Sequence, residues 1–184
     1  MAALQLDALP QEARATIEQG EALMGFVPND ALIMAHKPQL LTAFLQLVKA
    51  VYAPSELEPA LKRLIGMVAS RTAECHYCEV HTANSAHQLG VPLTKLTALC
   101  DFANSDQFTA AEKAALQVAA GAARVPNGVT DIEFAALDEH YSEKAKVDIL
   151  SVISLFGFLN RWNSTLHTTV EDTPNATWRQ LDTR

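Results

Sequence analysis

Apolar residues recur at helical spacing along most of this chain. In the segment 61–72 they follow one another at intervals of three and four positions, which places them on one stripe of a helix. Segments 10–23 and 39–52 are rich in Ala, Leu, Gln and Glu and stop at glycine or proline, so we expect two further helices there. No run alternates between apolar and polar residues with a period of two, as half-buried strands do. The pattern therefore predicts an all-α fold, a multi-helix bundle.

The second half of the chain continues this pattern and carries clear helix starts. The segment 92–102 opens on proline, and capping-box sequences begin at Thr109 and at Thr130. The segment 142–165 is apolar almost throughout, which predicts a buried central helix or a helix at a subunit interface. The last residues, 171–184, carry scattered charge and a proline, so we expect them to form a loose tail.

Length and composition are those of one globular domain covering residues 1–184. Hydrophobic residues make up 49% of the chain and charged residues 19%, which leaves apolar surface for self-association, so we expect a homo-oligomer. The net charge of −7 argues against nucleic acid as a partner, because phosphate contacts need clustered Lys and Arg. No stretch reaches the roughly 20 apolar residues of a membrane span, and the N-terminal region lacks the apolar run of a signal peptide. We therefore expect a cytoplasmic protein that makes no membrane contact.

Two thiols and two imidazoles lie within the seven positions 75–81. If a helix begins near Cys75, then Cys78 lies one turn further on and nearly on the same face, so the two sulfurs can meet. The helix N-terminus favours a thiolate there. His81 lies about 60° around the helix from Cys78, which makes it the natural base, and Thr82 lies about 40° to the other side. Because structural disulfides are rare in the cytosol, this pair is expected to be catalytic or metal-binding.

Other interpretations of these residues have less support in the sequence. A structural zinc site needs four ligands, and His87 lies on the wrong face of the helix to join the two cysteines and His81. Two cysteines one turn apart can also be buried as small hydrophobic residues, and Cys100 is expected to serve packing alone. His76 points between the thiols and solvent. We expect no metal and no cofactor.

The sequence around the two cysteines resembles the alkylhydroperoxidase D and carboxymuconolactone decarboxylase family. The similarity extends over about residues 20–170 and is greatest to the longer, peroxidase-related members, and it implies an all-helical oligomer. The segments and residues that carry it are Cys75-His76-Tyr77-Cys78, His81, Ala86, Gly90, Gly25-Phe26-Val27-Pro28-Asn29, Pro38 and Leu155 to Trp162.

The resemblance also implies a reaction and roles for both cysteines. In that family the second cysteine attacks a peroxide and becomes a sulfenic acid, while the first donates a proton and then closes the disulfide. Carried over, Cys78 is the peroxidatic residue and Cys75 the resolving one. The implied substrate is a hydroperoxide, and the implied reductant is a dithiol or a protein partner that the sequence does not identify.

Two positions depart from the family pattern. The family's relay histidine lies four residues after the second cysteine, where this chain has Thr82, and its relay glutamate lies where this chain has Arg63. A cation at Arg63 can instead stabilise a thiolate through space. Arg63, Thr82, Tyr77 and His76 are therefore possible supporting residues. The carboxylates that the sequence offers in place of the relay glutamate are Glu56, Glu58, Glu74 and Glu79.

Two other functions stay open at this point. Some family members are lyases that decarboxylate a lactone acid, and a non-enzymatic redox sensor could use the same cysteine pair. A decarboxylase needs an acid or base and electrophilic stabilisation but no dithiol, so the pair favours redox chemistry.

Overall fold

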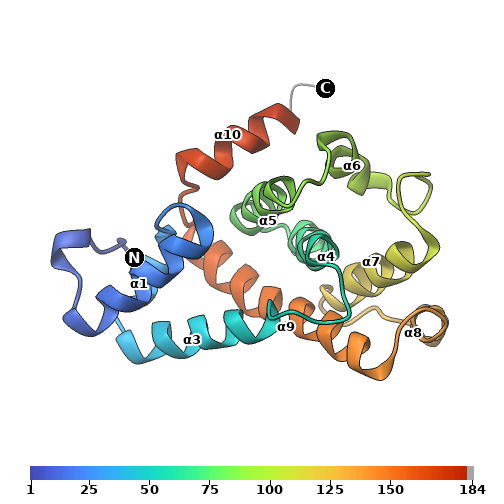
Figure 1. The fold of residues 1–184 in the computed structure, drawn as a ribbon, viewed down its shortest axis with the longest axis horizontal. Coiled ribbons are helices and arrows are strands. Elements are labelled where there is room, and N and C mark those ends of the chain that lie inside the picture. The colour runs from blue at the N-terminus through green and yellow to red at the C-terminus, as the bar shows by residue number, and fades with distance from the viewer. Residues whose placement is uncertain (182–184) are drawn as a thin grey trace.

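The structure, a computed structural model, describes residues 1–181. These residues form helices joined by short loops and contain no strand, so the predicted all-α fold is confirmed (Figure 1). The elements in chain order are η1 (Leu6–Ala8), α1 (Gln11–Met24), α2 (Asn29–Met34), α3 (Pro38–Val51), α4 (Pro59–Thr72), α5 (His76–Gln88), α6 (Leu93–Ala98), η2 (Leu99–Asp101), α7 (Ala110–Ala122), α8 (Asp131–Asp138), α9 (Glu143–Leu166) and α10 (Asp172–Leu181).

Helix α4 lies at the centre of the bundle. Its residues from Leu64 to Ser70 are all buried, and it packs against α5, α7 and α9. The close approach of α9 depends on Gly66, since a Cβ atom at this position would overlap the Phe156 ring. This helix, rather than the predicted 142–165, is the central one.

Helix α9 buries only part of its apolar surface within one chain. Its bounds agree with the predicted 142–165 to within one residue, and Ser142 caps it by accepting a hydrogen bond from the backbone N–H of Ala145. Val147, Leu150 and Phe158 remain exposed. The placement of this helix at an interface, the number of subunits and the number of domains stay predictions.

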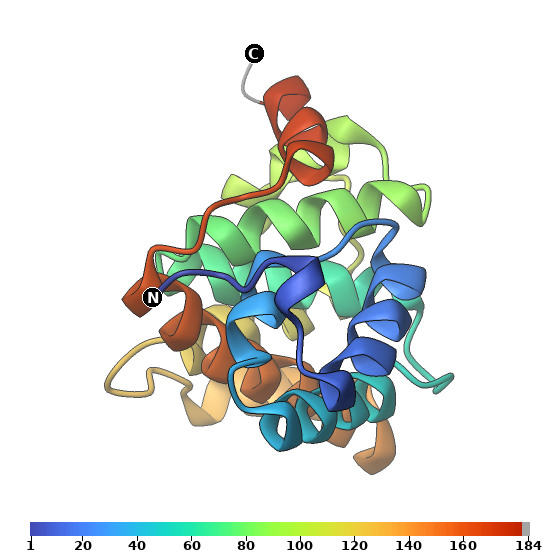
Figure 2. The same ribbon diagram turned by 90° about the vertical axis from the view of Figure 1, so that its left-hand side faces the viewer.

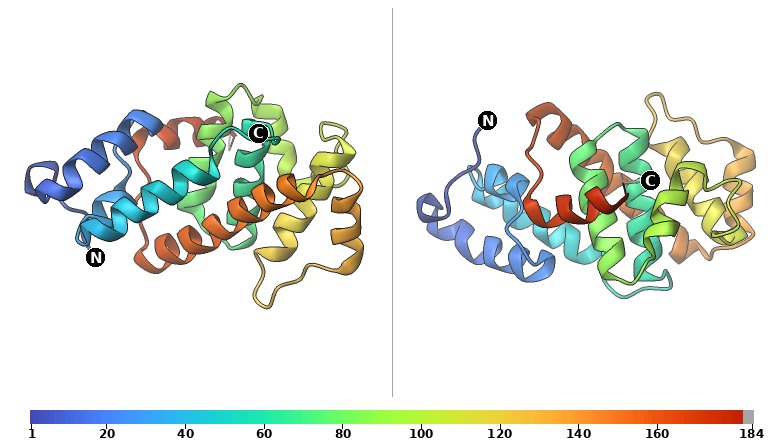
Figure 3. Two further views of the ribbon diagram at one scale, coloured as in Figure 1. Left: turned by 60° about the horizontal axis from the view of Figure 1, so that its bottom comes forward. Right: turned by 90° about the horizontal axis from the view of Figure 1, so that it is seen from above.

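The first three helices form a smaller cluster beside the central bundle. Helices α1 and α2 pack on α3, which runs alongside α9 (Figure 3). Figure 2 shows this N-terminal cluster in front, with α10 above α5. Leu32, Met34 and Leu41 belong to the buried core of the cluster, and Leu159 of α9 packs against it. The N-terminal helices therefore face α9 and the first turns of α5 across a common space.

Helix starts were predicted well and one helix length was not. Both capping boxes are present, with Thr109 and Thr130 each accepting from the backbone of a glutamate three residues on. The predicted helix 92–102 is instead the short α6 followed by the single turn η2.

The predicted loose tail is wrong as far as Leu181. Residues 172–181 form α10, which packs against α5, and Thr177 donates a hydrogen bond to Asn84 Oδ1 at 2.7 Å. Pro174 does not prevent this helix because it lies in the first turn, where its missing N–H would have no intrahelical partner. Residues 182–184 of the expected tail lie outside the described residues.

No helix among residues 1–181 is long and apolar enough to cross a membrane.

Candidate active site

The two cysteines lie at the N-terminus of α5, as predicted. The chain reverses between α4 and α5 through Glu74, which has a φ of 54°, and Cys75 then caps α5 in an extended conformation. Cys75 N–H closes this turn by donating to Ser70 O at 2.9 Å. Both Cys75 and Cys78 are buried, no disulfide joins them in this structure, and their side chains hydrogen-bond each other.

This hydrogen bond makes the two thiols a coupled pair. The thiol of Cys78 donates to Cys75 and lowers the pKa of Cys75 to about 6. The same hydrogen bond, together with burial and the charge on Cys75, raises the pKa of Cys78. The pair therefore gives up one proton readily and holds the second. Moving the shared proton along the S–H···S contact transfers the negative charge to Cys78.

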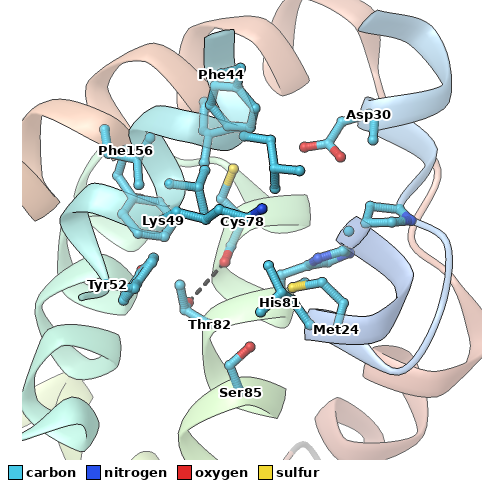
Figure 4. A pocket seen from close by; sticks show the side chains of 18 of the residues that line it. Met24, Asp30, Phe44, Lys49, Tyr52, Cys78, His81, Thr82, Ser85 and Phe156 are labelled. Carbon is cyan, nitrogen blue, oxygen red and sulfur yellow. Dashed lines mark hydrogen bonds between the residues drawn. The ribbon is translucent and has the colours of Figure 1, made fainter. Parts of the chain in front are cut away.

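Cys78, but not Cys75, lines a cavity next to α5. This cavity of about 300 Å³ is enclosed by α1, α2, α3, α4, α5 and α9, and Figure 4 shows the Cys78 sulfur within it. Most of the lining is apolar, with Phe44 and Phe156 on one side and Met24 on another. An apolar organic molecule fits such a site better than a small, strongly hydrated one.

A histidine–carboxylate pair lies on the same helix face. His81 Nε2 is 2.6 Å from Glu171 Oε2, and both side chains are largely buried. Glu171 Oε1 accepts from Tyr77 Oη at 2.8 Å and from Asn29 N–H at 2.5 Å. Although burial alone raises it, these contacts, led by that of His81, hold the pKa of Glu171 below its ordinary value. The Tyr77 ring stacks on the imidazole at 4.1 Å, so His81 is fixed in position.

The side-chain amide of Asn163 connects Cys78 to a second carboxyl group, that of Asp30. Asn163 Nδ2 is 3.4 Å from Cys78 Sγ and 3.3 Å from Asp30 Oδ2. Asp30 lines the cavity, and burial raises the pKa of its carboxyl. Burial thus favours the protonated form of the Asp30 carboxyl, which Asn163 connects to the Cys78 sulfur.

Some of the predicted supporting residues line the cavity and others do not. Arg63 and Thr82 line the cavity, while His76 is exposed and lies edge-on to Trp178. The Thr82 hydroxyl donates to the backbone carbonyls of Cys78 and Glu79, so it is engaged within the helix. Cys100 is exposed, which contradicts the expectation that it serves packing.

None of the carboxylates offered by the sequence pairs with His81. Glu56 bonds Ser142, Glu79 pairs with Arg71 at 2.6 Å, and Glu58 and Glu74 are exposed. The partner is Glu171 instead, which the sequence reasoning placed in the loose tail.

Three residues at this site were missed: Asp30, Asn163 and Glu171. Each lies more than 45 positions from Cys78 in the sequence and is brought to the site by the packing of α2, α9 and the segment before α10. Asp30 directly follows the upstream segment that resembles the family, which is the one local signal that pointed to it.

Among residues 1–181 no group of three or more His, Cys, Asp or Glu side chains is arranged to hold a metal ion. The zinc interpretation of Cys75, Cys78 and His81 therefore has no ligand set in the described part of the chain.

Comparison with known proteins agrees with this fold. The model of the carboxymuconolactone decarboxylase family matches residues 38–121. The crystal structure of the apo debrominase Bmp8 is 34% identical, with a TM-score of 0.90 over 98% of this chain and 96% of that one. The chain belongs to the alkylhydroperoxidase D and carboxymuconolactone decarboxylase family.

Other similar proteins of this family are less closely related in sequence. The alkylhydroperoxidase D core of an uncharacterized peroxidase-related protein from Ralstonia eutropha JMP134 is 25% identical, with a TM-score of 0.83 over 95% of this chain and 93% of that one. The uncharacterized protein YnjA of Escherichia coli K12 is 26% identical over 112 residues. That match covers 61% of this chain and 62% of the length of that curated relative.

Proposed function

We propose that this protein is a thiol-dependent peroxidase that reduces apolar organic hydroperoxides. The observation that carries the proposal is the coupled pair, in which Cys78 lines an apolar cavity while its partner Cys75 lies behind it. Such a pair supplies two electrons and needs no cofactor. The relationship to peroxidase-related proteins supports the same chemistry.

The reaction balances on these two thiols and the hydroperoxide. The Cys78 thiolate attacks the terminal oxygen of ROOH, the O–O bond breaks, and Cys78 becomes a sulfenic acid while RO⁻ leaves. Cys75 then attacks the Cys78 sulfur, which forms the disulfide and releases water. A dithiol reductant exchanges with this disulfide and restores both thiols.

The buried acid and the histidine serve the protons of this reaction. We assign to Asp30 the proton that converts RO⁻ to ROH, because burial raises the pKa of its carboxyl and Asn163 bridges it to Cys78. His81 uses Nε2 for Glu171, which leaves Nδ1 for proton exchange, and it accepts the proton that the cysteine pair must lose. The role of His81 as base stays a prediction, and the structure adds Glu171 as the partner of its imidazole.

Reductive dehalogenation is a second candidate, favoured by the full-length similarity to a debrominase. A cysteine-to-alanine variant of Bmp8 was crystallised with 2,3,4-tribromopyrrole, and that structure is 33% identical with a TM-score of 0.91 over 98% of this chain and 96% of that one. The same two thiols balance this reaction: the C–Br bond becomes C–H, bromide leaves, and the thiols become a disulfide. The thiol reactions account for the features of the cavity described above. None of these features favours lactone decarboxylation or a purely sensory role over them.

Rapid mixing of the reduced protein with a panel of substrates tests the proposal. The panel is hydrogen peroxide, cumene hydroperoxide and tribromopyrrole, with the oxidation state of each cysteine read by mass spectrometry. We expect cumene hydroperoxide to react fastest and to give the Cys75–Cys78 disulfide while Cys100 stays reduced. Cys75→Ser should stop at the sulfenic acid on Cys78, and Cys78→Ser should not react. Bromide release without peroxide consumption would favour the second candidate, and a pair inert to all three substrates would contradict both.

A further inference from the structure

One wall of the cavity carries hydrogen-bond donors that the protein itself does not use. The guanidinium carbon of Arg63 lies 3.6 Å above the centre of the Tyr52 ring, so the cation is held against the aromatic face. Both residues line the same cavity as Cys78. Within residues 1–181, Arg63 Nε and the Tyr52 hydroxyl are shielded from solvent, and the two side chains have no hydrogen-bond partner other than each other.

Buried donors without partners are costly unless a ligand satisfies them. A buried donor that is left unpaired destabilises the folded protein, and a charged donor does so more than a neutral one. None of the ion pairs found in the described part of the chain includes Arg63, in contrast to Arg71 two turns further along α4, which pairs with Glu79. The wall therefore lacks an acceptor, and an anionic one suits the charge of Arg63.

Other charged groups of the cavity fix where such an acceptor would lie. Lys49 also lines the cavity, but it is exposed and its Nζ already donates to Gln19 at 2.5 Å. Asp30 occupies the opposite side, with Cys78 between it and Tyr52 in the view of Figure 4. An anion is thus attracted to the Arg63 side and repelled from the Asp30 side whenever Asp30 is ionised.

We infer that Arg63 and Tyr52 form a recognition site for a carboxylate, so that the cavity takes an apolar organic acid whose reactive end lies at Cys78. The inference deepens the proposed function, on which its statement about the reactive end rests. The apolar lining receives the body of the ligand, and the guanidinium offers its N–H groups to the carboxylate oxygens. Tyr52 contributes a hydroxyl that stays protonated, because burial raises its pKa.

Binding of matched, unreactive probes tests this site without any thiol chemistry. The probes are 4-isopropylbenzoate and its neutral amide, and calorimetry on the reduced protein gives the affinity of each. We expect the carboxylate to bind about 10-fold or more tightly, as one hydrogen-bonded buried charge pair provides. Arg63→Gln should bring the two probes to near parity by weakening the carboxylate alone, and Arg63→Lys should keep part of the preference. Arg71→Gln is the matched control on the same helix and should leave the preference intact.

Three results would overturn the inference. They are equal affinity of both probes for the unaltered protein, a preference that survives Arg63→Gln, and a preference that is lost equally in the Arg71→Gln control. Because neither probe is a peroxide, this outcome is independent of the substrate panel described above. A carboxylate preference in a protein that reduces no peroxide would leave the binding site standing and remove the proposed reaction.

Discussion

Replacing Glu171 by glutamine tests whether the histidine–carboxylate pair acts in the reaction. Both carboxylate oxygens of Glu171 take part in hydrogen bonds. Oε1 accepts from Tyr77 and Asn29, and Oε2 faces His81 Nε2. A glutamine has one acceptor oxygen and one NH₂ group. If its oxygen keeps the two donors at the first position, the NH₂ faces His81 Nε2, which must then accept and carry its proton on Nδ1 instead.

The size of the effect follows from these contacts. With Nδ1 protonated, His81 no longer offers a basic nitrogen, so the reaction of Cys78 with hydroperoxide should slow by about 100-fold or more at pH 7. The lost charge and the imperfect hydrogen bonds should cost about 1–3 kcal/mol of unfolding free energy. Because the pKa of Glu171 is lowered in the folded state, its ionised form stabilises the fold above the ordinary glutamate value of 4.5. The stability difference from the unaltered protein should therefore shrink as the pH falls below that value.

Stopped-flow kinetics with cumene hydroperoxide and urea unfolding measure the two effects separately. Glu79→Gln is the matched control, since Glu79 lies on the same helix as His81 and pairs with Arg71. We expect the control to react at nearly the normal rate. A Glu171→Gln variant that is destabilised but reacts as fast as the unaltered protein would show that the pair only supports the fold, and that His81 is not the base.

Two further predictions concern the thiol pair and the packing of α9 on α4. The rate of reaction with peroxide should rise as the pH passes about 6, because the thiolate is the reactive form and the pKa of Cys75 is lowered to about 6; a midpoint near the ordinary value of 9.0 would contradict the shared proton with Cys78. Gly66→Ala should cost about 1–3 kcal/mol in urea unfolding, because its Cβ would overlap the Phe156 ring. Gly157→Ala, at a helical position where an added Cβ would meet no atom within 4 Å, should instead stabilise the protein by about 0.5–1 kcal/mol. Equal effects of the two substitutions would refute the packing argument.

Local patterns in the sequence predicted those features of the fold that depend on interactions between residues close in the chain. The spacing of apolar residues indicated the helices, and the capping boxes at Thr109 and Thr130 marked two starts correctly because both partners lie within four residues of each other. The position of Cys75 at a helix start, and of Cys78 one turn on, belongs to the same class of prediction.

The partners of the reactive groups lie far away in the chain and follow from packing alone. His81 and Glu171 are 90 residues apart, and Asn163 is 85 residues from Cys78. The segment resembling the family included Asn160 near the end of α9, but that side chain is directed to the backbone of Ala69, and the residue one turn further on reaches the sulfur. Helical spacing gives the face of one helix, whereas the choice between neighbouring faces depends on how α9 sits against α4 and α5.

The exchange of carboxylate and cation around the cavity links the proton chemistry to ligand binding. The family resemblance places a relay glutamate at position 63, on the cavity wall, and here that position holds Arg63. Glu171 serves His81 from the segment before α10, so the imidazole keeps a carboxylate although position 63 no longer provides one. We propose that position 63 takes no part in proton transfer and that its cation, which lies over the Tyr52 ring with a buried Nε–H that is not satisfied, binds an anion. On this proposal the arginine at position 63 serves substrate selection, within a fold that matches the debrominase with a TM-score of 0.90.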